Sequence, residues 1–266
     1  MAEIAMLHDV EKCTACRGCQ VACKQWKNLA ADKQPFTGEF QSHKDLGPQT
    51  LNIIRMREDY SSGNMKWIFS KFQCMHCGEP ACALACPEEA LWKTENGPVA
   101  HSDEKCVGCG YCVTNCTFGV PHVDPVTKKS TKCDLCADRI EKGMVPSCAL
   151  TCTSDAILFG TREEMIAYAE KRLAAMKDKY PNACLYGVDK NDGIKGTSML
   201  YIFHDKPSVF GFPDEPQVPS TIPVWKDVVQ PAGKVLMAAA GVAVAAGFVA
   251  NSVIGVGSKK GDKDHE

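Results

Sequence analysis

Sixteen of the seventeen cysteines in this 266-residue chain lie in four tight groups of four. The first and third groups share the spacing C-x2-C-x2-C-x3-C, whereas the middle gap holds four residues in the second group and eleven in the fourth. Thiols this close together are typical of metal ligation, since disulfide-rich secreted chains are much shorter. The groups are Cys13, Cys16, Cys19 and Cys23; Cys74, Cys77, Cys82 and Cys86; Cys106, Cys109, Cys112 and Cys116; and Cys133, Cys136, Cys148 and Cys152.

The spacing favours cubane iron–sulfur clusters over zinc. Thiolates of one short loop can reach three iron corners of a cubane, and the cysteine three residues further on lies about one helical turn away. In two-cluster ferredoxins this last cysteine ligates the other cluster. Structural zinc is the alternative, because paired C-x2-C motifs also make zinc ribbons. Two groups here pack three cysteines into seven residues, which a zinc ribbon does not need.

Exchange of the last cysteines predicts four ligand sets. The second and third groups are close in sequence and predict one two-cluster ferredoxin unit, around which the first and fourth groups pair. We therefore expect four [4Fe–4S] clusters. The predicted sets are Cys13, Cys16, Cys19 and Cys152 (set A); Cys23, Cys133, Cys136 and Cys148 (set B); Cys74, Cys77, Cys82 and Cys116 (set C); and Cys86, Cys106, Cys109 and Cys112 (set D).

The expected fold class is α+β, with two interleaved ferredoxin-like units, each for two [4Fe–4S] clusters, and one C-terminal transmembrane helix. Glu11-Lys12-Cys13 recurs as Glu104-Lys105-Cys106 before the same spacing, which indicates an internal duplication. The expected parts are an outer unit (1–72 and 117–160), an inserted unit (73–116), a helix with strands that pack on the cluster domain (161–205), a proline-rich arm (206–231), a transmembrane anchor (232–257) and a polar tail (258–266).

Several elements can be predicted between the cysteine groups. Residues 91–101 predict a hairpin, and 50–56, 156–159 and 198–204 predict strands, whereas 27–49 predict a loop. Thr161 and Glu164 form a capping-box motif, from which an amphipathic helix is expected to run to about Lys179 before Pro181. Six prolines between 206 and 231 predict an extended arm.

The segment Val235–Val256 is almost wholly apolar and long enough to cross a bilayer, for which about 20 residues are needed. The alternative is a buried core helix. If the segment spans a membrane, its many small residues predict that it docks on another transmembrane protein. Lys259, Lys260 and Lys263 follow the segment and Lys226 and Lys234 precede it, so the positive-inside rule predicts a cytoplasmic C-terminus and an external cluster domain.

The charged residues, the histidines and the remaining cysteine give less information about function than the cysteine groups do. Lys12, Lys105 and Lys132 each precede the first cysteine of a group, and two interpretations stand: they offset cluster charge, or they are exposed loop lysines. Cys184 is expected to be a buried structural thiol, and none of His8, His76, His101 and His122 has ligand spacing. Residues 1–10 lack the apolar region of a cleavable signal peptide. The formal net charge of −2 gives no reason to expect nucleic-acid binding.

The sequence resembles the four-cluster iron–sulfur subunits of molybdenum and tungsten oxidoreductases, and within them the beta subunits of membrane-bound formate dehydrogenases. The resemblance covers nearly the whole chain: all four cysteine groups, the eleven-residue gap and the C-terminal helix. It is most specific in Cys13–Trp26 (CTACRGCQVACKQW), in Leu200–His204 (LYIFH) and in Ile222–Lys226 (IPVWK).

The resemblance implies an electron-transfer subunit rather than a catalyst. It implies a partner that carries a Mo/W-pterin and oxidises formate, a haem b membrane subunit that takes electrons to quinone, and export together with a partner that has a twin-arginine signal. Some relatives replace a cysteine of the third group by Trp, but Cys109 is present here, which implies four cubanes. Arg17 and Lys24 are expected to face the catalytic partner.

Other functions are compatible with the cysteine pattern. Within the same class, the chain could serve a hydrogenase, a polysulfide reductase or a similar enzyme. A free-standing membrane polyferredoxin or scaffold is an alternative of another class, disfavoured by the arm and the small-residue anchor. An enzyme in its own right is least favoured, since no nucleophile–base pair, phosphate loop or open metal site stands out.

Overall fold

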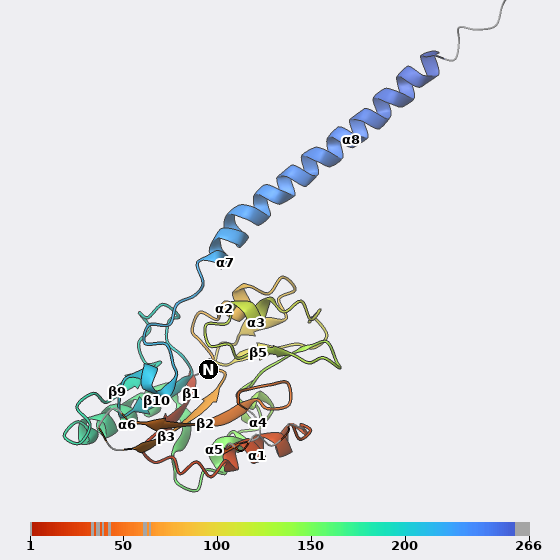
Figure 1. The fold of residues 1–266 in the computed structure, drawn as a ribbon. Helices are drawn as coiled ribbons and strands as arrows, with labels where there is room; N and C mark the ends of the chain where they lie inside the picture. The colour runs from red at the N-terminus through yellow and green to blue at the C-terminus, as the bar shows by residue number, and fades with distance from the viewer. Residues whose placement is uncertain are drawn as a thin grey trace, which may run out of the picture. The chain divides into compact units, whose positions relative to one another are not determined.

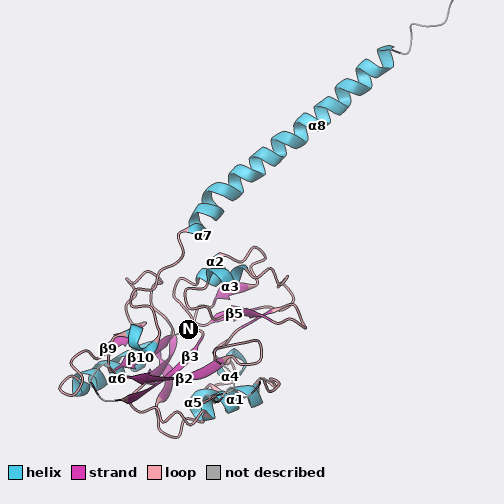
Figure 2. Cartoon of the chain, in the orientation of Figure 1, coloured by secondary structure: helices cyan, strands magenta, loops and turns pink. Residues whose placement is uncertain are grey.

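The computed structural model describes residues 2–32, 35, 38, 40–41, 44–60, 63 and 65–258, and gives only the backbone of 223, 226, 227 and 253–258. The predicted loop 27–49 and tail 258–266 therefore lie partly outside the described residues. The chain divides into two compact units, Met1–Pro219 and Ser220–Glu266. Short helices and strands joined by long loops make up the first unit (Figure 2).

Ten strands and seven short or medium-length helices of the first unit are described, and Figure 1 shows their arrangement. Its strands are β1 (Ile4–Asp9), β2 (Asn52–Asp59), β3 (Lys66–Gln73), β4 (Leu91–Lys93), β5 (Val99–His101), β6 (His122–Val123), β7 (Ser130–Thr131), β8 (Ile157–Thr161), β9 (Cys184–Tyr186) and β10 (Met199–Phe203). Its helices are α1 (Gly18–Trp26), α2 (Ala81–Leu84), α3 (Tyr111–Asn115), α4 (Ala137–Ile140), α5 (Ser147–Leu150), α6 (Arg162–Met176) and the 3-10 helix η1 (Pro207–Phe210).

A four-stranded sheet in the order β8-β1-β10-β9 joins the N-terminal strand to segments that follow the last cysteine group. β1 runs parallel to β10 and antiparallel to β8, with Met6 opposite Met199 and Phe159. Parallel neighbours need a crossover connection, and here the crossover contains all four cysteine groups. The sheet therefore joins the two ends of the cysteine-rich segment.

Both faces of this sheet are buried, and the period-2 alternation of strands assigns each residue to one face. Leu7 and Leu200 pack with Ala169 of α6, so this helix covers one face. Met6 and Tyr201 belong to the larger core, which also contains Cys19, Cys74, Cys133 and Cys148, with Cys116 packed against it. These cysteines thus lie on the face opposite α6.

Local predictions hold at several elements. The hairpin expected over 91–101 is formed by β4 and β5, with Leu91 opposite His101. The strand expected over 50–56 begins and ends slightly later, as β2, and pairs with β3 along its whole length. The capping box of Thr161 and Glu164 is formed in both directions. α6 ends at Met176, three residues before the expected end near Lys179, and the chain turns ahead of Pro181.

The extended arm expected over 206–231 is wrong in two places. Phe210 of η1 and Phe212 are buried in the core of the first unit, so this part is not a surface arm. Residues 221–231 are helical: α7 (Thr221–Pro223), a π-helix η2 (Val224–Val229) and α8 (Gln230–Ser258) follow one another. Pro207 occupies a first helical turn, where its missing amide costs no hydrogen bond. Pro231 follows the π turn, a local adjustment that can accommodate a missing donor.

Residues Gln230–Ser252 of α8 are long and apolar enough to cross a membrane, by length and composition. This agrees with the anchor expected over 232–257.

Candidate iron–sulfur sites

Helices α1 and α5 bring the first and fourth cysteine groups together. α1 carries Cys19 and Cys23 four residues apart, and α5 carries Cys148, with Cys152 shortly after its end. The Ser147 hydroxyl at the start of α5 donates a 3.3 Å hydrogen bond to the Ala22 carbonyl of α1. Each helix can therefore present thiols to two separate cavities.

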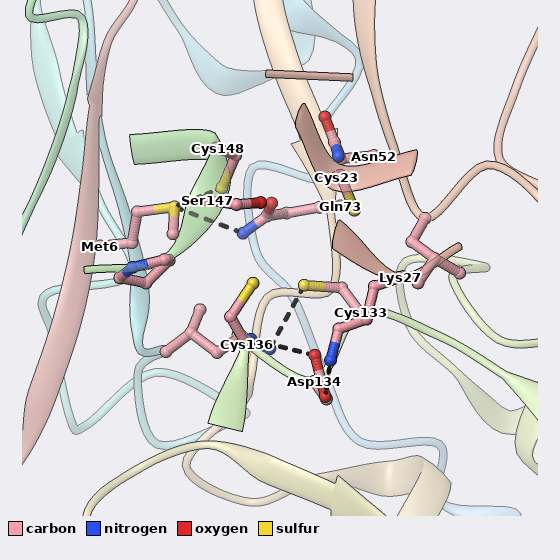
Figure 3. A pocket seen from close by; sticks show the side chains of 13 residues that line it. Met6, Cys23, Lys27, Asn52, Gln73, Cys133, Asp134, Cys136, Ser147 and Cys148 are labelled. Carbon is pink, nitrogen blue, oxygen red and sulfur yellow. Dashed lines mark hydrogen bonds and ion pairs between the residues drawn. The ribbon is translucent and has the colours of Figure 1, made fainter. Parts of the chain in front are cut away.

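Two cavities hold these thiols. The lining of the first includes Cys13, Cys16, Cys19 and Cys152, which are the four members of set A. The lining of the second includes Cys23, Cys133, Cys136 and Cys148, the members of set B. Figure 3 shows the second cavity, with Met6 and Gln73 on its wall beside Cys148.

The second and third groups are brought together in the same manner by α2 and α3. The lining of a third cavity includes Cys86, Cys106, Cys109 and Cys112, the members of set D. For set C, burial raises the pKa of Cys77 well above its ordinary value, and the nearby Cys74, Cys116 and Cys82 raise it further. The members of sets A, B and D thus line one cavity each, and Cys77 is influenced by the other three members of set C.

Charge effects between thiols link neighbouring sets, although burial is the largest cause of the raised pKa of each thiol concerned. Cys148 of set B raises the pKa of Cys19 of set A, which Lys71 lowers, and Cys74 of set C raises the pKa of Cys133 of set B. Cys112 of set D likewise raises the pKa of Cys82 of set C. These influences connect set A with set B, set B with set C and set C with set D.

In each of the four groups, the backbone turns through the left-handed region two residues after the first cysteine. The residues there are Ala15 (φ 54°), His76 (φ 51°), Gly108 (φ 71°) and Leu135 (φ 58°). A non-glycine residue in this conformation costs about 1–2 kcal/mol. The same conformation at four loops curls the backbone around its thiols, and its recurrence agrees with the duplication seen in the sequence.

Backbone amides donate hydrogen bonds to the sulfurs. The amide of Ala90 lies 3.3 Å from Cys86 Sγ, and the amide of Val120 lies 3.5 Å from Cys116 Sγ, so the donor follows the last cysteine by four residues in both groups. Ser130 donates to Cys106 Sγ at 3.3 Å. Hydrogen bonds to sulfur are among the features that set iron–sulfur potentials.

The thiols themselves are poor candidates for free thiolates. Burial raises the pKa of Cys19 and of Cys82 to about 12 and that of Cys23 to about 11. Thiolates would form in these sites only with strong positive charge beside them, and a coordinated metal deprotonates its thiol outright. The donor set therefore fits an iron–sulfur cluster.

A buried, unpaired polar side chain gives a second test of this fit. His8 lines the set A cavity and is fully buried, and neither of its ring nitrogens has a hydrogen-bond partner among the described residues. Burial and then the charge of Lys71 lower the pKa of His8 to about 3, so the ring is neutral and keeps one N–H donor. A cluster in this cavity offers the sulfur acceptors that the protein does not.

The three lysines that precede cysteine groups differ from one another. Lys105 is exposed on its loop, as the simpler interpretation has it. Lys12 is half-buried and donates a 2.9 Å hydrogen bond to the Tyr168 hydroxyl. Lys132 is buried, hydrogen-bonds the carbonyls of Val99 and Cys133, and lowers the pKa of Cys82, although burial of that thiol dominates. Of the three, Lys132 is the one that is buried and lowers the pKa of a grouped thiol, so its position agrees with the interpretation that it offsets cluster charge.

Two cysteines remain exposed among the sixteen, Cys16 of set A and Cys109 of set D. They occupy the same position in the duplicated groups, one in set A and the other in set D. Arg17 and Lys24, expected to face a partner, are both partly buried and engaged within the chain. Arg17 donates to the Phe40 carbonyl, and Lys24 forms a 3.0 Å ion pair with Asp32.

Sequence reasoning missed some residues at these sites. His8 and His101 both stand five residues before the first cysteine of a duplicated group, a signal that the repeat contained. His101 lines the set D cavity. Lys71 is fully buried near sets A and B, and its only sequence signal is a lysine within a strand that leads to Cys74. Cys184 is only partly buried, on the edge strand β9, with its Sγ 3.5 Å from the Asp205 carbonyl oxygen, so it is less buried than expected.

Comparison with known families and proteins also indicates iron–sulfur clusters. Two profiles described as "4Fe-4S dicluster domain" match the chain, over residues 12–90 and 65–162. A "Formate dehydrogenase iron-sulfur subunit" of Haemophilus influenzae is 37% identical over 99% of this chain and 84% of its own length.

Further relatives carry similar names. The "Formate dehydrogenase, nitrate-inducible, iron-sulfur subunit" of Escherichia coli is 36% identical over 100% of this chain and 89% of its own length. A "Formate dehydrogenase 2 subunit beta (cytochrome c-553)" of Nitratidesulfovibrio vulgaris is 39% identical over 76% of this chain and 94% of its own length.

Proposed function

The chain belongs to the family of formate dehydrogenase iron–sulfur subunits, and on that premise we propose that its sixteen grouped cysteines hold four [4Fe–4S] clusters in the row A, B, C, D. The single observation that carries this proposal is that four thiols line each of the three cavities, in the sets that cross between cysteine groups. The proximity of Cys74, Cys77, Cys82 and Cys116 supports the fourth site.

Bound there, the clusters would supply one-electron carriers, and the protein would contribute their spacing and surroundings. Exposed Cys16 and Cys109 give sets A and D a surface at opposite ends of the row. Electrons would therefore enter at one end and leave at the other, with sets B and C between them. By likeness to the family, the donor is a Mo/W-pterin subunit that oxidises formate.

We further propose that the acceptor is a haem b membrane subunit, which passes electrons to quinone. The length and composition of Gln230–Ser252 support a membrane anchor. Its small residues, among them Gly241, Ala243 and Gly247, would let the helix of a membrane partner approach closely. With the C-terminus in the cytoplasm, the cluster domain lies on the outer face, in accord with the lysines that flank the helix.

Purification of the membrane complex under anaerobic conditions, through a tag on this chain, tests the proposal. Four cubanes predict about sixteen irons for this chain, together with Mo or W, haem and formate-dependent dye reduction. Sixteen irons without formate activity would keep the electron-transfer role and assign the subunit to another oxidoreductase. Zinc in place of iron would refute the proposal.

A further inference from the structure

Lys71 is a buried cation near two of the candidate cluster sites. It lies in β3, three residues before Cys74, and is fully buried. Its ammonium hydrogen-bonds the side-chain oxygen of Gln73, and among the described residues no carboxylate forms an ion pair with it. Burying an ammonium without a counter-charge is strongly unfavourable, so its position implies negative charge that the side chains do not supply.

The register of the β2–β3 hairpin places Lys71 between two cavities. Lys71 is opposite Ile54, and Gln73 is opposite Asn52, so these four residues share one face of the hairpin. Ile54 lines the set A cavity, whereas Asn52 and Gln73 line the set B cavity (Figure 3). Lys71 therefore stands at the boundary between sets A and B.

The electrostatic neighbours of Lys71 agree with this position. Burial lowers its pKa, but the charges of Cys148, Cys19, Cys133 and Cys23 oppose this and raise the pKa above its ordinary value. These neighbours belong to set A (Cys19) and to set B (Cys148, Cys133 and Cys23). Conversely, after burial, Lys71 is the largest influence on Cys19 and on Cys23.

We propose that the Lys71 ammonium is a shared counter-charge for the clusters of sets A and B, and that it raises the reduction potentials of both. This inference rests on the proposed function, since it requires clusters in both sets. A [4Fe–4S] cluster with four thiolates carries a net negative charge that grows by one on reduction. A nearby cation stabilises the reduced state more than the oxidised state, and the low dielectric of the interior strengthens the effect.

Gln73 has a supporting role in this arrangement. Its amide oxygen accepts from Lys71, and its amide nitrogen points to sulfur, 3.3 Å from Met199 Sδ and 3.7 Å from Met6 Sδ. A neutral partner fixes the ammonium in place without cancelling its charge. The full charge of Lys71 therefore remains available to the clusters on either side.

The test is an EPR-monitored redox titration of the purified complex that carries Lys71→Met. This change removes the charge but keeps an unbranched side chain of similar length. Two of the four cluster couples are expected to shift to lower potential, and the other two to stay in place. Lys66→Met is the matched control, because Lys66 is an exposed lysine at the start of the same strand and its removal should move no couple.

The number of redox couples and the iron content together separate the possible outcomes. If the wild-type complex shows fewer than four cluster couples, the proposed function fails. If it shows four, and Lys71→Met keeps its iron but shifts no pair of couples, only the present inference fails. An equal shift of all four couples, or the same shift in Lys66→Met, would also overturn it.

Lys71→Arg covers the case in which the neutral variant does not assemble. Loss of iron in Lys71→Met but not in Lys71→Arg would support the need for a cation between the two sets. Loss of iron in both variants would mean that the shape of the lysine matters rather than its charge, and would refute the proposal.

Discussion

The chemistry of the sites depends on a few residues around the thiols rather than on the thiols alone. Sulfur ligands are common to all four sets, but the neighbours differ: a neutral histidine with unpaired nitrogens at set A, and a buried Lys132 near set C. Hydrogen bonds, burial and nearby charge set iron–sulfur potentials over more than a volt. Differences between such neighbours can therefore give chemically identical cubanes different potentials.

His8 provides a test at this scale. Replacing His8 by Phe keeps a buried ring but removes the N–H donor from the wall of the set A cavity, so one cluster couple should move to lower potential. EPR-monitored titration measures this shift. His204→Phe is the control, because His204 also has an unpaired buried nitrogen but packs against Phe210 and Tyr180 instead. Equal behaviour of the two variants would contradict the expectation.

Gly108 provides a second test. Its φ of +71° is unfavourable for other residues, and a Cβ there would overlap the Lys128 carbonyl oxygen. Gly110 has a φ of +78° but open space around its Cα. Gly108→Ala should therefore lower the thermal stability and the iron content of the chain more than Gly110→Ala, which adds only backbone strain of about 1–2 kcal/mol. Equal losses in the two variants would show that the close contact is unimportant.

At the level of elements, short helices are the means by which cysteine groups exchange ligands. α2, α4 and α5 have four residues each, too few to be stable as isolated helices. Each lies next to a cysteine of its group: Cys82 is in α2, Cys148 is in α5, and Cys136 is the residue just before α4. α1 is longer and carries Cys19 and Cys23 on adjacent turns, one for each of two neighbouring sets.

Single-cysteine variants test this exchange. Cys23→Ala should remove the same EPR couple as Cys133→Ala, because both belong to set B, and the iron content should fall by about a quarter. Cys19→Ala, a change in the same helix, should instead remove the couple that is lost in Cys13→Ala. If Cys23→Ala removes the couple assigned by Cys13→Ala, the first group keeps its own four cysteines and the crossed scheme is wrong.

For the molecule as a whole, the division after Pro219 separates the cysteine-rich region from the apolar helix. All sixteen grouped cysteines and their cavities belong to the first unit, and residues 220–258 contribute none of them. Cluster binding and membrane attachment are therefore expected to be separable properties of the chain.

A stop codon after Pro219 tests this separation. Expressed without partner subunits and with iron–sulfur assembly supported, the shortened chain should keep about sixteen irons and remain in the soluble fraction. The full-length chain should sediment with membranes and resist a carbonate wash. A shortened chain that still sediments with membranes, or that loses its iron, would contradict the expected division.

The features that could be predicted from the sequence are those that depend on residues close together in the chain. Ligand spacing, the capping box at Thr161, the hairpin at 91–101 and the apolar run of the last helix are local properties, and the sequence determined them by itself. The crossed lining of three cavities also agrees with the sequence expectation that a cysteine about one helical turn beyond its loop faces another site.

Tertiary structure alone decided which polar residues are buried between the sites. Lys71 and His8 look like ordinary strand residues in the sequence, and only the packing of β3 and β1 against the cavities gives them a role. The same is true of the prolines after residue 206, since burial of Phe210 and Phe212 depends on distant aromatic side chains. Local patterns fix ligands and elements, whereas burial depends on contacts between segments far apart in the chain.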